Sequence, residues 1–145
     1  RTEATSEAEL IDPGGVLWLR SADIGYVDDE GFLYIVDRKK DMILSGGQNI
    51  YPQDIEAILV DHELVDDVAV IGLSSARWGE TPVALVVPVE GVQVNHAAVR
   101  EWANSRLGKQ QRLADVILRE ELPRNPNGKI LKHELRKEYG DREYG

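Results

Sequence analysis

The chain has 145 residues, enough for one ordinary domain, or for one small domain together with a piece of another. Its composition, 42% apolar and 30% charged, is that of a soluble globular protein, and no apolar run approaches the length of a membrane span. A net charge of −9 argues against a general nucleic-acid-binding surface, and the lack of cysteine excludes disulfides and thiolate chemistry. The three histidines, His62, His96 and His133, lack metal-ligand spacing, so we expect no metal site in this chain.

The first part of the chain alternates apolar runs with strong turn signals. Residues 3–10 predict a short helix, which the sequence Asp12-Pro13-Gly14-Gly15 ends. Three strands are predicted at residues 16–19, 21–27 and 32–36. The last two strands form a hairpin around the turn at residues 28–31, and two strands alone bury too little surface to be stable. Residues 1–36 therefore belong to a larger body, either the domain that follows or one that this sequence lacks.

A charged joint follows at Asp37–Asp41, where each of five consecutive residues is charged. A short apolar run, the paired glycines Gly46 and Gly47, and a helix start at Pro52 come directly after it. A charged joint that leads into a strand and a glycine turn is not the pattern of a core element. We interpret it as the place where two bodies meet and a phosphorylated ligand passes between them.

After the joint, the order of predicted elements is strand, helix, strand, strand, helix, strand, helix. These elements cover residues 42–44, 53–59, 65–73, 82–89, 96–107, 114–118 and 130–139, with loops at 74–80 and 122–128. Asn95 is a suitable cap for the second helix, and Gly108 ends it. The order predicts an α+β fold in which helices cover a small three-stranded sheet, with a β-hairpin at its entrance.

Two residues near the joint could bind a nucleotide. Asp23 lies before Gly25 in the predicted hairpin, where its carboxylate could accept hydrogen bonds from both hydroxyls of a ribose. The alternative is that Asp23 caps a turn. The guanidinium of Arg38 suits bidentate contact with phosphate or ribose oxygens, and its alternative is a surface ion pair with Asp37 or Asp41.

Two turns that contain glycine are the other candidate sites. Ser45-Gly46-Gly47 lacks the spacing of a phosphate-binding loop, but paired glycines let the backbone turn sharply or approach a narrow ligand. The sequence Asn125-Pro126-Asn127-Gly128-Lys129 places a lysine just past a flexible turn. That lysine is either an ordinary exposed side chain or a mobile charge that neutralises developing phosphate charge.

Three segments, taken together, resemble motifs of one enzyme superfamily. Trp18–Gly25 is similar to W-x-R-T-G-D-x-G, Asp37–Gly47 to D-R-x-K-D-x-I-x-x-x-G, and Leu122–Ile130 to L-P-R-x-x-x-G-K. These motifs belong to the C-terminal part of the ANL superfamily, which contains acyl-CoA synthetases, adenylation domains and firefly-luciferase-like enzymes. The match runs through nearly the whole chain, in order and with the spacing of the family.

The resemblance implies an ATP-dependent acyl-CoA ligase with two half-reactions. A carboxylate attacks the α-phosphate of ATP to give acyl-AMP and pyrophosphate, and the thiol of CoA then displaces AMP. Lys129 would bridge the carboxylate and the phosphate in the first step. The nucleotide would contact a set of residues from the hairpin and the joint, Asp23, Tyr34, Ile35 and Arg38. Mg²⁺ would be bound mainly by the large N-terminal domain.

The resemblance also implies a lid that swings between the two half-reactions. Lys40 matches the hinge position of the family. Rotation about it would withdraw Lys129 and present the turn Ser45-Gly46-Gly47 to the tunnel for the pantetheine of CoA. Trp78 is a further candidate contact with CoA.

The same resemblance divides the chain into three parts. Residues 1–39 would be the tail of the large N-terminal domain, residues 40–140 the mobile lid domain, and residues 141–145 a short tail. The large domain, with its phosphate loop and acyl pocket, is then the partner that this chain lacks, so we expect the fragment alone to be inactive. We expect no nucleic-acid partner and no transmembrane segment, and a cytoplasmic location, with a membrane-peripheral parent as the alternative.

Two departures from the family pattern affect this reading. Thr-Gly-Asp has become Ser21-Ala22-Asp23, in which Ala22 adds a methyl group where the nucleotide must fit closely. The family's aromatic-Lys-x-Pro reads Gln110–Leu113, which weakens any claim of a CoA clamp there. Two alternative functions stay open: an adenylation domain that passes an amino or aryl acid to a carrier-protein thiol, and a non-catalytic interaction module that keeps the fold.

Overall fold

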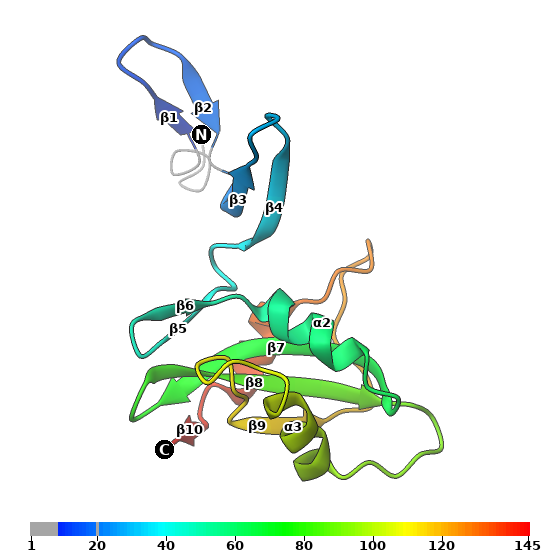
Figure 1. Ribbon diagram of the computed structural model, residues 1–145. Coiled ribbons are helices and arrows are strands. Elements are labelled where there is room, and N and C mark those ends of the chain that lie inside the picture. The colour runs from blue at the N-terminus through cyan, green and yellow to red at the C-terminus, as the bar shows by residue number, and fades with distance from the viewer. Residues whose placement is uncertain (1–8, 20) are drawn as a thin grey trace. The chain divides into compact units, whose positions relative to one another are not determined.

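The computed structural model describes residues 9–19 and 21–145, except for the side chains of residues 19 and 36–38. The chain divides into two compact units, Arg1–Lys40 and Asp41–Gly145 (Figure 1). Within the described part of the chain, no helix has the length and apolar character needed to cross a membrane.

The described part of the first unit contains two antiparallel hairpins, each a separate two-stranded sheet. One joins β1 (Glu9–Ile11) to β2 (Leu17–Leu19), and the other joins β3 (Asp23–Val27) to β4 (Leu33–Arg38). The hairpin expected around the turn at residues 28–31 is thereby confirmed. The helix expected over residues 3–10 is wrong at its end, because Glu9 and Leu10 pair with β2, and residues 3–8 lie outside the described residues.

An aspartate closes each of the two hairpin turns in the same way. One carboxylate oxygen of Asp12, and one of Asp28, accepts the backbone N–H groups two and four residues further on, at 2.9–3.0 Å. Asp12 also accepts the indole N–H of Trp18 at 2.9 Å. That indole, more than any other group, holds the pKa of Asp12 below its ordinary value, and the N–H of Phe32 does the same for the pKa of Asp28.

The second unit is built on a six-stranded sheet with the order β10-β7-β8-β5-β6, in which β9 also pairs with β8. Its strands are β5 (Ile43–Ser45), β6 (Gln48–Ile50), β7 (Val65–Ser75), β8 (Gly79–Pro88), β9 (Asp115–Leu118) and β10 (Glu143–Tyr144). The long antiparallel pair β7–β8 is its centre, and its register runs from Val65↔Pro88 to Ser75↔Gly79. The loop expected over residues 74–80 is therefore only a tight turn at residues 76–78.

Helices cover both faces of this sheet (Figure 1). One core lies under α2 (Pro52–Val60) and α3 (His96–Asn104), and the other lies under α4 (Lys132–Tyr139). Successive residues of β7 and β8 enter alternate cores, so both strands are apolar almost throughout rather than at every second position. The Asn95 side chain accepts the N–H groups of Ala97 and Ala98 and caps α3, as the sequence predicted.

The observed elements confirm the α+β class and extend the predicted sheet. The expected three strands are β7, β8 and β9, and the expected entrance hairpin is β5–β6, which joins the same sheet. Residues 141–145, expected as a tail, contain β10, which pairs in parallel with the end of β7. This short pairing is long-range, and two residues carry too little pattern to predict it from sequence.

Candidate functional site

The hairpin β3–β4 carries all four residues assigned to the nucleotide. Asp23, the first residue of β3, is the cross-strand partner of Arg38, the last residue of β4, although the Arg38 side chain lies outside the described part. Tyr34 and Ile35 are neighbours in β4 and so point to opposite faces of the hairpin. The ring of Tyr34 stacks on Tyr26, with ring centroids 5.1 Å apart.

A glycine sets the close approach of these two strands. The ladder has an irregularity between Ile24 and Gly25, and a Cβ built on Gly25 would lie 2.5 Å from the carbonyl oxygen of Tyr34. No side chain fits at that distance, so glycine is required here. The close approach brings the Asp23 end of β3 and the Tyr34–Ile35 segment of β4 into one short hairpin.

Ala22 is strained. Among the residues that the structure describes, it is the one residue other than glycine with a positive φ, 62°. Its carbonyl oxygen accepts the N–H of Lys39 at 2.9 Å, and the neighbouring Ser21 hydroxyl accepts the N–H of Asp23 at 3.3 Å. The left-handed conformation costs an L-residue roughly 1–2 kcal/mol, and glycine adopts it freely. The departure Thr-Gly-Asp to Ser-Ala-Asp therefore has a backbone cost in addition to the added methyl group.

In the second unit, the structure brings Ser45, Gly46 and Trp78 together. Gly46 and Gly47 join β5 to β6 with φ values of 56° and 81°. The N–H of Gly46 donates to the carbonyl oxygen of Trp78 at 2.8 Å, and a Cβ built on Gly46 would lie 3.0 Å from the Trp78 ring. A Cβ built on Gly47 meets no described atom within 4 Å. Gly46 is thus packed against tryptophan, whereas Gly47 is open.

Glu80, which the sequence did not single out, fastens the strand that leads into this turn. Its carboxylate accepts the N–H of Leu44 at 2.8 Å, and β5 pairs with β8 only at Ser45↔Gly79. The side chain therefore substitutes for a longer strand ladder. The sequence signal was its place in Arg77-Trp78-Gly79-Glu80, two residues after the tryptophan that the resemblance had indicated.

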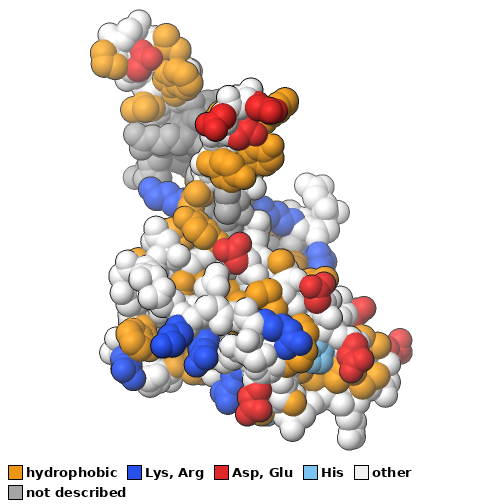
Figure 2. Space-filling view, in the orientation of Figure 1, with side chains coloured by type: hydrophobic (Ala, Val, Ile, Leu, Met, Phe, Trp, Pro, Cys, Tyr) orange, Lys and Arg blue, Asp and Glu red, His pale blue; other side chains and the backbone are white. Residues whose placement is uncertain are grey.

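A cavity of about 520 Å³ adjoins the glycine turn. Ser45, Gly46 and Trp78 line it, together with Lys109 and Arg112 from the loop after α3. The space-filling view shows Lys and Arg side chains over this part of the unit, with Asp and Glu toward the end that carries Glu63 (Figure 2). The sequence marks Lys109 and Arg112 as a local gathering of basic residues but does not place them at the glycine turn, because the segment departs from the family pattern and its position near Trp78 depends on the tertiary fold.

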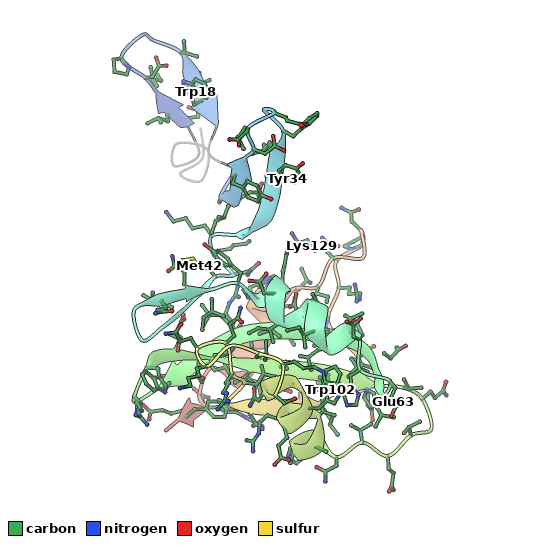
Figure 3. All side chains as sticks on the ribbon, in the orientation of Figure 1. Trp18, Tyr34, Met42, Glu63, Trp102 and Lys129 are labelled. Carbon is green, nitrogen blue, oxygen red and sulfur yellow. The ribbon has the colours of Figure 1, made fainter. Side chains whose placement is uncertain are left out.

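The loop that carries Lys129 is closed by hydrogen bonds. The Asn125 side-chain oxygen accepts the N–H groups of Asn127 at 3.0 Å and Lys129 at 2.8 Å. The Asn125 N–H donates to the Lys129 carbonyl oxygen at 2.9 Å, and Gly128, with φ 82°, donates back to the Asn125 carbonyl. The turn is thus more ordered than its Pro, Asn and Gly content indicated. The Lys129 side chain is exposed, outside the layers of sheet and helices (Figure 3).

The lysine loop and the glycine turn occupy different ends of the second unit. Figure 1 shows the loop between β9 and α4 and the turn of the hairpin β5–β6 at separate places on the unit. α4 contacts two segments near the start of the unit, the residue Asp41 and the helix α2. Arg136 donates to the Asp41 carboxylate at 3.0 Å, and Lys132 forms an ion pair with Glu56 of α2 at 2.8 Å. Lys40, the expected hinge, is the exposed residue just before Asp41.

Comparison with known proteins gives consistent matches. A sequence model of the AMP-binding enzyme C-terminal domain matches residues 54–129. Long-chain-fatty-acid–CoA ligase FadD13 of Mycobacterium tuberculosis is 47% identical over 139 residues, which are 96% of this chain and 26% of the relative. The chain thus spans about a quarter of the length of this curated relative.

Two solved structures have the same fold. ATP-bound MatB from Rhodopseudomonas palustris superposes with a TM-score of 0.84 at 33% identity, over 96% of this chain and 27% of that one. The o-succinylbenzoate CoA synthetase of Bacillus subtilis, in complex with the acyl-adenylate OSB-AMP, superposes with a TM-score of 0.77 at 35% identity. That match covers 94% of this chain and 27% of the synthetase.

The two glycines of the turn should respond differently to substitution. We expect Gly47→Ala to lower the free energy of unfolding by about 1 kcal/mol, the cost of a left-handed backbone. Gly46→Ala should lower it by about 2 kcal/mol or more, because its Cβ also meets the Trp78 ring. Urea denaturation of both variants measures the difference.

Trp78→Ala provides the control for this comparison. In that background the ring is gone, so Gly46→Ala should cost no more than Gly47→Ala does. Equal costs for the two glycine variants in the presence of Trp78 would show that the ring does not constrain the turn.

Proposed function

Because this chain belongs to the family of AMP-binding enzyme C-terminal domains, within the ANL superfamily, we propose that it is the mobile lid of an ATP-dependent acyl-CoA ligase. The full-length protein adenylates a carboxylic acid and transfers the acyl group to CoA. One observation carries this proposal: a single unit presents an exposed lysine on an ordered loop at one end and a glycine turn beside a cationic cavity at another. Two half-reactions need these two features in turn.

Lys129 serves the first half-reaction. A carboxylate oxygen of the acid forms a bond to the α-phosphorus of ATP, and the bond to pyrophosphate breaks. Two anions must meet in this step, so an ammonium group between them stabilises the transition state. The exposed Lys129 on its hydrogen-bonded turn can supply that charge.

The first unit supplies part of the nucleotide site. We propose that Asp23 and Arg38, which pair across β3 and β4, bind the ribose hydroxyls. Tyr34 and Ile35 of the same hairpin would lie near the nucleotide. The described residues group no three Asp, Glu or His side chains that could hold a metal ion, so we assign no step of this chain to Mg²⁺.

The exposed apolar surface of the first unit supports its assignment to a larger domain. Large apolar side chains of both hairpins, among them Trp18, Phe32 and Leu33, are more than half exposed. Two-stranded ribbons with such surfaces are stable when a larger body covers them. We therefore assign residues 1–39 to the end of a large N-terminal domain, with residues 40–140 as the lid.

The cavity beside the glycine turn suits the second half-reaction. In this step the thiol of CoA loses its proton to solvent, its sulfur bonds to the acyl carbon, and AMP leaves with the electron pair of the broken bond. Pantetheine is a narrow chain that passes close to a backbone without side chains, which Gly46 and Gly47 provide. Trp78 offers a flat apolar surface, and Lys109 and Arg112 offer cations for the phosphates of CoA.

The cations of the cavity favour CoA over a carrier protein as the acceptor. Both acceptors present the same pantetheine thiol, but only CoA carries the nucleotide with its additional phosphates. A non-catalytic module would have no need of an exposed lysine on an ordered turn together with this cavity. We assign Lys40 as the hinge because it is the last residue before the unit that carries both features.

Removal of the Lys129 ammonium should separate the two half-reactions. In the full-length protein, we expect Lys129→Ala to slow formation of acyl-AMP by about 10²–10³-fold, the usual cost of losing one group that stabilises transition-state charge. Thioester formation from supplied acyl-AMP should stay near the wild-type rate. Pyrophosphate release and CoA thioester formation measure the two steps separately.

Two further results test the same assignment. This chain alone should release no AMP above the blank from ATP, CoA and a carboxylic acid, because the acyl pocket lies elsewhere. If Lys129→Ala slows both half-reactions equally, the role assigned to the lysine is wrong.

The cavity can be tested by charge reversal. In the full-length protein, Lys109→Glu should raise the KM for CoA by about 10-fold at low ionic strength, because a cation that attracts the phosphates becomes an anion. The effect should shrink as salt is added. Lys137→Glu, an exposed lysine of α4 that does not line the cavity, is the matched control. An equal rise in both variants would remove the cavity from CoA binding.

A further inference from the structure

Arg124 joins the lysine loop to the sheet. One guanidinium nitrogen donates to the carbonyl oxygen of Gly128, and another donates to the carboxylate of Asp67, each at 2.5 Å. The Gly128 carbonyl is part of the peptide bond that leads into Lys129. The planar fork of arginine can hold two acceptors in fixed directions at once, which the point charge of lysine cannot do. One side chain thus links β7 to the residue beside the lysine.

Asp67 is itself held in place by an irregularity in β7. The register of β7 and β8 shifts between Val65 and Asp67, so that Val65 packs against the core under α2 and α3. Asp67 then shares a face with Ala69, which enters the core under α4. Its other carboxylate oxygen accepts the N–H of Val68 at 2.9 Å, which fixes the direction of the carboxylate toward Arg124.

The pair contributes little to folding. The Arg124 side chain is 43% exposed and the Asp67 side chain 31%, and ion pairs with such exposure stabilise a protein by about 0–1 kcal/mol. The loop is closed without Arg124 by the Asn125 side chain, and it joins the core through Ile130. A variant that loses the pair is therefore expected to fold, while the direction in which the loop presents Lys129 is less well defined.

We propose that Arg124, held by Asp67, is a positioning residue for Lys129 in the adenylation step, an inference that rests on the proposed function. Lysine has four rotatable side-chain bonds, so the protein controls its ammonium mainly through the backbone from which it starts. A displacement of about 1 Å from the reacting geometry can cost about 100-fold in rate. An exposed ion pair with little effect on stability can therefore have a large effect on catalysis.

Kinetics of the full-length protein test this proposal. Arg124→Gln should lower the kcat of acyl-AMP formation by about 10-fold, with the KM for ATP within about 2-fold and thioester formation from supplied acyl-AMP unchanged. Asp67→Asn should have a similar effect, and the double variant should be no slower than the worse single one, because both remove the same link. Arg124→Lys should recover part of the rate, since its ammonium reaches one of the two acceptors.

Arg106→Gln is the matched control for these variants. Its guanidinium is exposed, stacks on Trp102 at 4.0 Å from the ring centroid, and has no contact with the loop. It should leave both half-reactions at the wild-type rate. Equal slowing of both half-reactions by Arg124→Gln, or no slowing of either, overturns the proposal.

Hydrogen exchange gives a readout that does not depend on catalysis. In this chain, Arg124→Gln should speed the exchange of the Gly128 and Lys129 amides and leave the amides of α3 unchanged. Faster exchange with an unchanged rate of acyl-AMP formation overturns the positioning role and leaves the function of Lys129 intact. If Lys129→Ala itself leaves acyl-AMP formation unchanged, the proposed function fails, and the positioning role falls with it.

Discussion

The burial of β7 and β8 on both faces is the constraint on which the second unit depends. Alternate residues of these strands enter two separate cores, one under α2 and α3 and one under α4. Because side chains in such cores are closely packed, the sheet and its three helices form one body with little internal freedom. Within the second unit, the glycine turn, the cations that line the cavity beside it and Lys129 lie outside both cores.

The attachments themselves are few and mostly polar. The glycine turn is fixed by the carbonyl of Trp78 and the carboxylate of Glu80, and the lysine loop by Asn125 and Arg124. Such surface contacts add little to the free energy of folding, but each one fixes a direction in space. The cores thus supply the stability, and these contacts supply the geometry that the two proposed half-reactions would need.

Much of the fold could be predicted from the sequence because its signals are local. Asn95 caps α3 through its own side chain, Pro52 opens α2, and the turns of both hairpins follow Asp and Gly. Long-range contacts could not be predicted in the same way. The pairing of β10 with β7 and the hydrogen bond from Leu44 to Glu80 leave no periodic pattern in the sequence. The residues themselves indicated Asp23, Arg38, the glycine turn and Lys129, and the resemblance to a family gave them roles and added further candidates. Lys109, Arg112 and Arg124 were assigned to no site until the structure showed what surrounds them.

The central claim is that one rigid unit swings about Lys40 and carries both functional ends with it. Distances between paired spin labels in the full-length protein test it most directly, with labels at the exposed positions Glu30, Val60 and His133. Between a state bound to an acyl-AMP analogue and a state bound to CoA, the Val60–His133 distance should stay constant while the Glu30–Val60 distance changes by many ångströms. A constant Glu30–Val60 distance, or an equal change in the Val60–His133 distance, would contradict the account.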